Sequence, residues 1–303
     1  MRCWIGVCCF FLLVQTVRAE NGLARITDHV YAYVDVQETS AANSFGANAG
    51  IIIGEKGIVV VDTLVSAKEA KRFIRDIEKI SDKPILYAVN THYHLDHSFG
   101  NAEFVKLGAK IVAHANCGDE MRQKATGALT NAGDYGLTPE DMAGTEIAYP
   151  EINFTDRLRL ELGDVEVELI YIAPSHSKGS IMVSLPQEKV VFSGDILFTD
   201  FHPYMGDGDI AGWQQNLDFL ADIEADKIIP GHGPLSGKKD VADMKAYITA
   251  FDKKAGELAA GSGKLEEIVA EMKKSLPARK QGEWLIGANL QIKYLKDGES
   301  GKD

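Results

Sequence analysis

Residues 85–97, with the sequence ILYAVNTHYHLDH, carry the most informative pattern in the chain. The first five are apolar, which is typical of a buried strand. Three imidazoles and a carboxylate follow closely after them, at His92, His94, Asp96 and His97. Histidine nitrogen and aspartate oxygen are ligands that Zn²⁺ accepts in proteins. In an extended or turning segment, the first two histidines project to one side and the last two residues turn towards a second point. The spacing therefore predicts a site for two metal ions.

Three more residues of ligand type follow apolar strands elsewhere in the chain. His176 lies in the sequence APSHSKGS, Asp195 in FSGD and His232 in IPGHG. Loops at strand ends are where binding and catalytic residues gather in open α/β sheets. Each of these short sequences alone is typical of an ordinary turn. Beside the histidine-rich segment, we expect all three residues to join the same site.

The order of the other elements predicts one layered α/β domain. Apolar runs alternate with stretches of helical period, and Ser66 is a candidate N-cap for the first helix. Such an order favours helices packed on sheets. Strands are predicted over residues 30–36, 49–54, 57–62, 84–89, 110–113, 157–160, 165–172, 180–185, 190–193 and 227–230. Helices are predicted over residues 66–80, 213–223, 240–258 and 264–274.

Residues 117–150 interrupt this order. Charged and small residues dominate the segment, and turn signals stand at Gly133-Asp134 and Thr138-Pro139. Helical spacing is visible only over residues 119–126. We therefore expect an excursion from the fold that covers the site, and we predict that it is mobile.

Composition places the chain among ordinary globular proteins. It has 303 residues, of which 45% are hydrophobic and 25% are charged, and this excludes a disordered or collagen-like chain. Lys and Arg total 32 against 44 Asp and Glu, which gives a formal net charge of −12. Binding to a nucleic-acid polymer relies on a basic footprint. We therefore expect a small-molecule substrate, and the oligomeric state stays open.

Residues 1–19 are predicted to be a secretory signal peptide. A positively charged start, a mostly apolar run over residues 4–17 and the small-residue site VRA (17–19) form the usual pattern. The apolar run is shorter than the roughly 20 residues that a membrane-spanning helix needs, and an uncleaved anchor is the alternative. Cleavage would leave Cys117 as the one cysteine of residues 20–303, without a spanning segment. The pattern thus predicts a secreted or periplasmic protein that has no internal disulfide.

On these motifs the chain resembles the metallo-β-lactamase superfamily, from about Ile26 to Ser236. The resemblance is carried by the hairpin that ends in Val61-Asp62, by the histidine-rich segment and by the later His, Asp and His at strand ends. It implies an α/β fold, a four-layer αββα sandwich. The domain would cover residues 20–303, with a mainly helical tail from about residue 238.

The resemblance also implies two Zn²⁺ ions per chain, with iron or manganese as alternatives. It assigns three residues to each ion and one bridge between them. The first ion would take His92, His94 and His176, the second Asp96, His97 and His232, and Asp195 would be the bridge. Asp96 would also orient the attacking hydroxide, which makes it the candidate catalytic residue. Asp62 would be a buried supporting residue, and His202 is a candidate for the pocket lining.

Two positions separate the chain from other branches of that superfamily. One large class of true β-lactamases has Cys in place of Asp195, and the di-iron flavoprotein branch has Glu in place of His94. The resemblance therefore implies a zinc hydrolase in which a hydroxide shared by the two ions attacks a small ester, thioester, lactone or β-lactam. Metal binding lowers the pKa of water to roughly 7. No Gly-x-Ser-x-Gly elbow offers a serine nucleophile instead.

Two alternatives remain open at this stage. An iron-dependent dioxygenase can be built on the same fold, although the relatives of that kind use only three metal ligands. A non-enzymatic role is the second alternative, as a carrier or as an accessory protein of a periplasmic quinoprotein or sulfur system.

Overall fold

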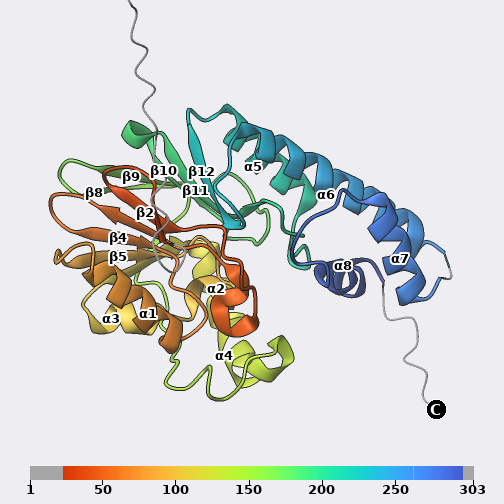
Figure 1. Ribbon diagram of the computed structural model, residues 1–303, viewed down its shortest axis with the longest axis horizontal. Helices are drawn as coiled ribbons and strands as arrows, with labels where there is room; N and C mark the ends of the chain where they lie inside the picture. The colour runs from red at the N-terminus through yellow and green to blue at the C-terminus, as the bar shows by residue number, and fades with distance from the viewer. Residues whose placement is uncertain (1–22, 262, 296–303) are drawn as a thin grey trace, which may run out of the picture.

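The computed structural model of the chain describes residues 23–261 and 263–295. Two β-sheets pack face to face, and helices cover the outer face of each sheet (Figure 1). The fold is therefore the four-layer αββα sandwich that the resemblance implied. The predicted signal peptide, residues 1–19, lies outside the described residues.

The first sheet has seven strands that lie in chain order. The first four pair antiparallel, and the next three continue the sheet in parallel. Parallel strands end at the same edge, so the loops that follow β4, β5 and β6 lie close together. The strands are β1 (Leu23–Arg25), β2 (Val30–Tyr33), β3 (Gly50–Ile53), β4 (Ile58–Val61), β5 (Ile85–Val89), β6 (Lys110–His114) and β7 (Ile152–Phe154).

The second sheet has five strands in the order β12-β11-β10-β9-β8. Three antiparallel pairings are followed by a parallel one between β11 and β12. The last two strands therefore also end at one edge. The strands are β8 (Arg157–Glu161), β9 (Glu166–Ile170), β10 (Met182–Leu185), β11 (Val190–Phe198) and β12 (Lys227–His232).

Aliphatic and aromatic side chains from both sheets form the central core. Val59 and Val61 of the first sheet belong to one cluster with Val183, Phe192 and Ile229 of the second. All are at most 2% exposed. Burial of this apolar surface is the main favourable contribution to holding the sheets together.

Two helices cover the outer face of the first sheet, α1 (Ala67–Glu78) and α3 (Asn101–Lys106). The side chain of Ser66 accepts a hydrogen bond from the backbone N–H of Glu69, and this caps α1 as predicted. Phe73 of α1 and Phe104 of α3 are fully buried in one cluster with residues of the sheet.

The C-terminal helices cover the outer face of the second sheet and extend beyond it to one side of the molecule (Figure 1). Trp213 and Phe251 are fully buried in this layer. The indole N–H of Trp213 donates to the carbonyl of Ile196, so the ring is also oriented. The helices are α5 (Ile210–Asp222), α6 (Lys238–Ala259), α7 (Leu265–Ser275), α8 (Leu285–Asn289) and the π-helical turn η4 (Leu290–Tyr294).

The segment expected as an excursion is more regular than the sequence predicted. Helix α4 (Ala115–Thr130) extends beyond residues 119–126 at both ends, and the short turn η2 (Ala132–Tyr135) follows. Its weak hydrophobic period explains the short prediction, because only a few side chains of α4 reach the core. Cys117 is one of them, fully buried and free. The mobility of this segment stays a prediction.

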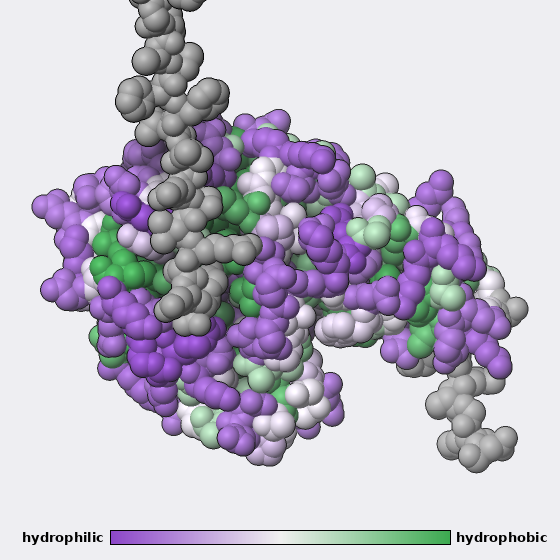
Figure 2. Space-filling view, in the orientation of Figure 1, coloured by the Kyte–Doolittle hydropathy of each residue, from purple (hydrophilic) through white to green (hydrophobic). Residues whose placement is uncertain are grey.

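The surface agrees with the acidic composition. Hydrophilic residues cover most of the face seen in Figure 2. Within residues 23–261 and 263–295, no helix is both long enough and apolar enough to span a membrane.

Candidate metal centre

The seven residues predicted as ligands meet at the edge where the strands of both sheets end. They form two groups, and within each group one candidate ligand atom per residue lies within 4.8 Å of the others. The groups divide as the spacing predicted, with His92 and His94 apart from Asp96 and His97. The first group is His92, His94, His176 and Asp195, and the second is Asp96, His97 and His232.

Helix α2 (Leu95–Ser98) begins directly after His94 and carries Asp96 and His97, so the two groups divide at its first residue. The backbone leaves β5, runs without regular structure through His92, and becomes helical directly after His94. The change from extended to helical backbone turns Asp96 and His97 away from the first two histidines. Three of these four side chains are less than 10% exposed, and His94 is partly open to solvent.

Asp195 lies between the two groups. One of its oxygens, Oδ2, is 3.2 Å from Nε2 of His176 and 3.7 Å from Nε2 of His92. The other oxygen, Oδ1, is 3.2 Å from Nε2 of His97 and 3.7 Å from Nε2 of His232. Each carboxylate oxygen therefore faces one group, which is the arrangement that a bridging ligand needs.

The position of Asp195 in the strand differs from the prediction. A loop was expected after residue 193, but β11 continues to Phe198 and its register with β12 shifts at Gly194. Gly194 has a φ of +49°, which favours glycine. A Cβ on Gly231 would lie 1.8 Å from Oδ1 of Asp195. The two glycines thus let a buried strand bring its carboxylate into the site.

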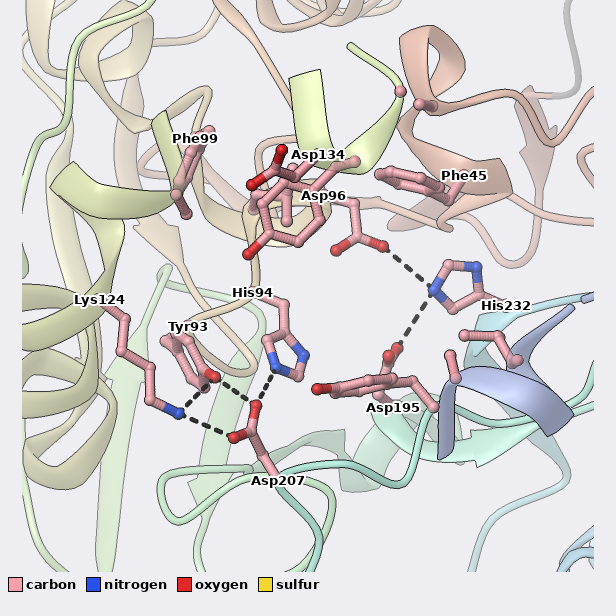
Figure 3. Close-up of a pocket in the computed structure, with 18 of the residues that line it drawn as sticks. Phe45, Tyr93, His94, Asp96, Phe99, Lys124, Asp134, Asp195, Asp207 and His232 are labelled. Atoms are coloured by element: carbon pink, nitrogen blue, oxygen red, sulfur yellow. Dashed lines mark hydrogen bonds and ion pairs between the residues drawn. The ribbon is translucent and has the colours of Figure 1, made fainter. Parts of the chain in front are cut away.

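Asp96 faces the second group. Its Oδ2 lies 3.3 Å from Nε2 of His232 (Figure 3). The same oxygen lies 3.4 Å from Nε2 of His97. The side chain also contributes to the lining of a cavity. The carboxylate of Asp96 therefore contacts the imidazoles of its group and is also accessible to a ligand in the cavity.

The protonation states favour cation binding in the first group. Burial and the charge on neighbouring imidazoles, that of His97 first, hold the pKa of His92 well below its usual range. Burial outweighs the opposing carboxylate of Asp195 and lowers the pKa of His176 to about 3. Both imidazoles are therefore neutral at pH 7, as a metal ligand must be.

Opposite charges are balanced around Asp195. Burial alone would favour its neutral form, but the imidazoles of His97, His232 and His176 hold the pKa of this carboxyl below its usual range. Conversely, the carboxylates led by Asp195 outweigh burial and raise the pKa of His97 well above its usual range. A divalent cation would take the place of that proton between the same groups.

The residues present fit divalent metal ions. In the part of the chain that the structure describes, three buried atoms that face into the groups have no hydrogen-bond partner: Nε2 of His92, Nε2 of His97 and Oδ1 of Asp195. Buried polar atoms are nearly always satisfied in native proteins. Imidazole nitrogen and carboxylate oxygen together suit Zn²⁺ and other first-row metals. A bound cation would satisfy these three atoms.

Asp62 supports the second group, where the resemblance placed a supporting residue. Its carboxylate accepts hydrogen bonds from the backbone N–H and the hydroxyl of Thr91, both at 2.8 Å. Its Oδ2 also lies 2.9 Å from Nδ1 of His97. A carboxylate on the far nitrogen of an imidazole fixes the ring orientation and leaves Nε2 free for a metal.

A second supporting carboxylate, Asp207, was missed by the sequence analysis. Its Oδ2 lies 3.0 Å from Nε2 of His94 (Figure 3). The Nδ1 of His94 lies 2.8 Å from Nε2 of His176. Asp207 also accepts hydrogen bonds from the hydroxyl of Tyr93 at 2.5 Å and from the ammonium of Lys124 at 2.9 Å. Despite burial, these partners hold the pKa of its carboxyl well below the usual range.

No local sequence pattern predicts this contact. Asp207 lies in a Gly- and Asp-rich turn, typical of an ordinary loop, and is 113 residues from His94. Lys124 lies on α4, in the segment whose helix was predicted too short.

The prediction for His202 is corrected by the structure. Its Nδ1 lies 2.6 Å from the hydroxyl of Tyr247 on α6, and the ring is not part of the cavity lining among the described residues. The neighbouring Phe201 takes that place, with its ring centroid 4.8 Å from that of His232. Since Phe201 and His202 are consecutive, their side chains point in different directions, and the aromatic one faces the site.

A cavity of about 990 Å³ opens onto the proposed ligands. His94, Asp96, Asp195 and His232 all contribute to its lining (Figure 3). A volume of this size is at the upper end of the range for small-molecule sites. The arrangement can thus present a substrate to two metal ions.

Comparison with known proteins agrees with the geometry. The family profile described as the metallo-beta-lactamase superfamily matches residues 42–232. A linear primary-alkylsulfatase of Pseudomonas sp. is 28% identical over 228 residues, which are 64% of this chain and 43% of the alkylsulfatase. A metallo-beta-lactamase type 2 of Bacteroides fragilis is 21% identical over 234 residues, which are 76% of this chain and 86% of that protein.

Solved structures show the same fold. The stereoselective inverting sec-alkylsulfatase Pisa1 from Pseudomonas sp. superposes with a TM-score of 0.67 at 21% identity. The match covers 92% of this chain and 51% of that one. This chain therefore spans about half the length of the alkylsulfatases that it matches.

Proposed function

Because the chain belongs to the metallo-β-lactamase superfamily, we propose that it is a dinuclear zinc hydrolase that cleaves an ester-like bond in a small molecule. The observation that carries the proposal is the position of Asp195, whose two oxygens each face one of two groups of imidazoles. One metal ion would lie in each group. Iron and manganese accept similar donors, and metal analysis distinguishes them from zinc.

Two zinc ions, when bound, would polarise the scissile bond and lower the pKa of water. Asp96 would act on the proton of that water. Its carboxylate lines the cavity beside His232, where it can accept a hydrogen bond from a water molecule and orient it towards the substrate. Asp96 is thus the proposed catalytic residue of the chain itself.

The supporting carboxylates would keep the imidazoles in place during turnover. Asp62 lies within hydrogen-bond distance of Nδ1 of His97, and Asp207 within hydrogen-bond distance of Nε2 of His94. These contacts fix the tautomer and rotation of the rings. They would reduce the reorganisation that the site needs when charge develops on the substrate.

Attack by water suits the side chains of the cavity. Among the described residues, no serine or cysteine lines it. Cys117 is buried in an apolar cluster, and burial raises the pKa of its thiol well above the usual range. A covalent intermediate on either residue type is therefore not part of the proposal.

The substrate classes that we propose are carboxylic esters, thioesters, lactones and β-lactams, and the alkylsulfatase relatives add sulfate esters. The acidic composition supports a small molecule over a nucleic acid. We also propose that residues 1–19 direct the chain to the periplasm or the exterior. Amino-terminal sequencing of the protein from the periplasmic fraction would test cleavage after Ala19.

The hydrolase proposal is tested with a substrate panel. The purified chain would be loaded with zinc and assayed against chromogenic esters, a thioester, an alkyl sulfate and a cephalosporin, before and after treatment with a chelator. We expect hydrolysis of at least one class, loss with the chelator and recovery with zinc. Asp195→Asn should lower turnover at least tenfold, and Asp200→Asn serves as the matched control, because that carboxylate is partly exposed and pairs with Lys280. Turnover that survives complete removal of metal would overturn the proposal.

A further inference from the structure

The cavity beside the proposed metal ligands has mostly apolar walls. Besides the polar residues at the metal centre, it is lined by side chains such as Phe45, Phe99, Leu285 and Ile292. Apolar walls of this extent gain binding energy mainly from apolar ligand surface. We propose that the cavity binds a hydrocarbon chain attached to the bond that is cleaved. This inference rests on the proposed hydrolase function in one respect: that function places the cleaved bond at the metal centre.

Part of these walls comes from outside the segment that matches the superfamily. The family profile ends at residue 232, whereas Trp284, Leu285, Ala288 and Ile292 lie on or next to α8 and η4. These short elements pack against α7. Leu285 and Leu290 are buried in the core between the second sheet and the C-terminal helices. The C-terminal extension seen in Figure 1 therefore adds an apolar wall to the site.

Exposed apolar side chains gather at the opening of the cavity. Seven large apolar side chains are exposed among the described residues, and three of them, Tyr135, Trp284 and Ile292, line the cavity. Trp284 is 62% exposed and Ile292 is 59% exposed. Exposed apolar side chains that cluster at one place mark binding sites. A hydrocarbon chain that leaves the cavity would cover these two residues.

The charged residues of the cavity lining indicate which head groups the ligand can carry. Lys124 is the one Lys or Arg in the described lining, and its ammonium already pairs with Asp207 at 2.9 Å and with the hydroxyl of Tyr93 at 2.7 Å. Asp134 adds a negative charge to the lining. A carrier with several phosphates needs free cations, and the lining offers none. The proposed substrate is therefore a simple alkyl or acyl chain with a compact head group, and not a nucleotide-linked thioester.

Binding of primary alcohols to the zinc-loaded full chain tests this proposal without turnover. Trp284 is the reporter, because of the two tryptophans in the described residues it is the one exposed at the cavity, whereas Trp213 is fully buried. We expect the fluorescence of Trp284 to shift to shorter wavelength as 1-butanol, 1-hexanol, 1-octanol or 1-decanol binds. The Kd should fall about fourfold for each added methylene until the cavity is filled. Trp284→Phe should remove the shift and so identify its source.

A pair of matched variants tests where the chain binds. Ile292→Asp puts a charge at the cavity opening, and Leu107→Asp puts the same charge at a side chain of similar exposure, 53%, that does not line the cavity. Ile292→Asp should weaken the binding of 1-decanol at least tenfold, and Leu107→Asp should leave it unchanged. Far-ultraviolet circular dichroism would confirm that both variants fold.

Three results would overturn the proposal: equal Kd values for all chain lengths, equal effects of the two variants, or tighter binding of decanoyl-coenzyme A than of 1-decanol. Failure of the two proposals can be told apart. Alcohols that bind with the expected length dependence to a chain that hydrolyses nothing would refute only the hydrolase function. Hydrolysis of short esters without any length dependence in binding would refute only the hydrocarbon site.

Discussion

Replacing Asp195 with alanine perturbs the contact between the two groups of ligands. The carboxylate lies 3.2 Å from an imidazole nitrogen of each group, so it would neutralise part of the charge of both cations. At about 4 Å and an effective dielectric constant near 20, two unit charges interact by about 4 kcal/mol. Desolvation of the buried carboxylate offsets part of this energy. We therefore expect a loss of about 3 kcal/mol, or roughly a hundredfold in affinity for the second ion.

The two groups should respond differently to this substitution. The first retains three imidazoles, from His92, His94 and His176, whereas the second retains two imidazoles and Asp96. We expect Asp195→Ala to keep about one zinc per chain at concentrations that load the wild type with two. Titration with zinc, followed by mass spectrometry of the metal content, measures both affinities directly. Turnover should fall at least tenfold, because charge stabilisation by one ion is lost.

Two further variants separate charge from shape. Asp195→Asn keeps the size of the side chain and should lose the second zinc as Asp195→Ala does. Asp200→Asn removes a carboxylate from the surface, where it pairs with Lys280, and should bind two zincs like the wild type. If Asp195→Ala bound two zincs with wild-type affinity and turned over normally, the bridge would have to be abandoned.

Two other substitutions test contacts around the metal centre. Asp207→Asn removes the charged acceptor of His94, and zinc affinity of the first group should fall about 10- to 100-fold; an unchanged zinc titration would show that the contact is incidental. Gly231→Ala places a Cβ 1.8 Å from Oδ1 of Asp195, so it should displace the carboxylate and weaken binding of the second zinc. Gly237→Ala is its control, because nothing lies within 4 Å of the added Cβ, and equal effects of the two would refute the steric explanation.

The grouping of the metal ligands could be predicted because it is local. His92, His94, Asp96 and His97 follow one strand, and their division into two groups depends only on the backbone turn after His94. His176 follows the short strand β9, His232 is the last residue of β12, and strand ends of a sheet meet at an edge. Their positions at strand ends therefore sufficed to predict one common site, whereas the resemblance implied which metal group each later residue joins.

The remaining parts of the site depend on contacts that are distant in the sequence. Asp207 reaches His94 across 113 residues, from a turn with no distinguishing local pattern. The continuation of β11 past Ser193 depends on its pairing with β12. Gly194 is typical of a turn, so the local sequence predicts that the strand ends there. Helix α4 was predicted too short because most of its surface faces solvent or the cavity and so lacks a clear apolar stripe.

The central claim, a pair of metal ions on either side of Asp195, is tested most directly by anomalous diffraction from crystals of the zinc-loaded chain. Data collected on both sides of the zinc absorption edge should show two peaks per chain. One should lie among His92, His94 and His176, and the other among Asp96, His97 and His232, with the carboxylate of Asp195 between them. A single peak, or peaks away from these residues, would contradict the dinuclear site.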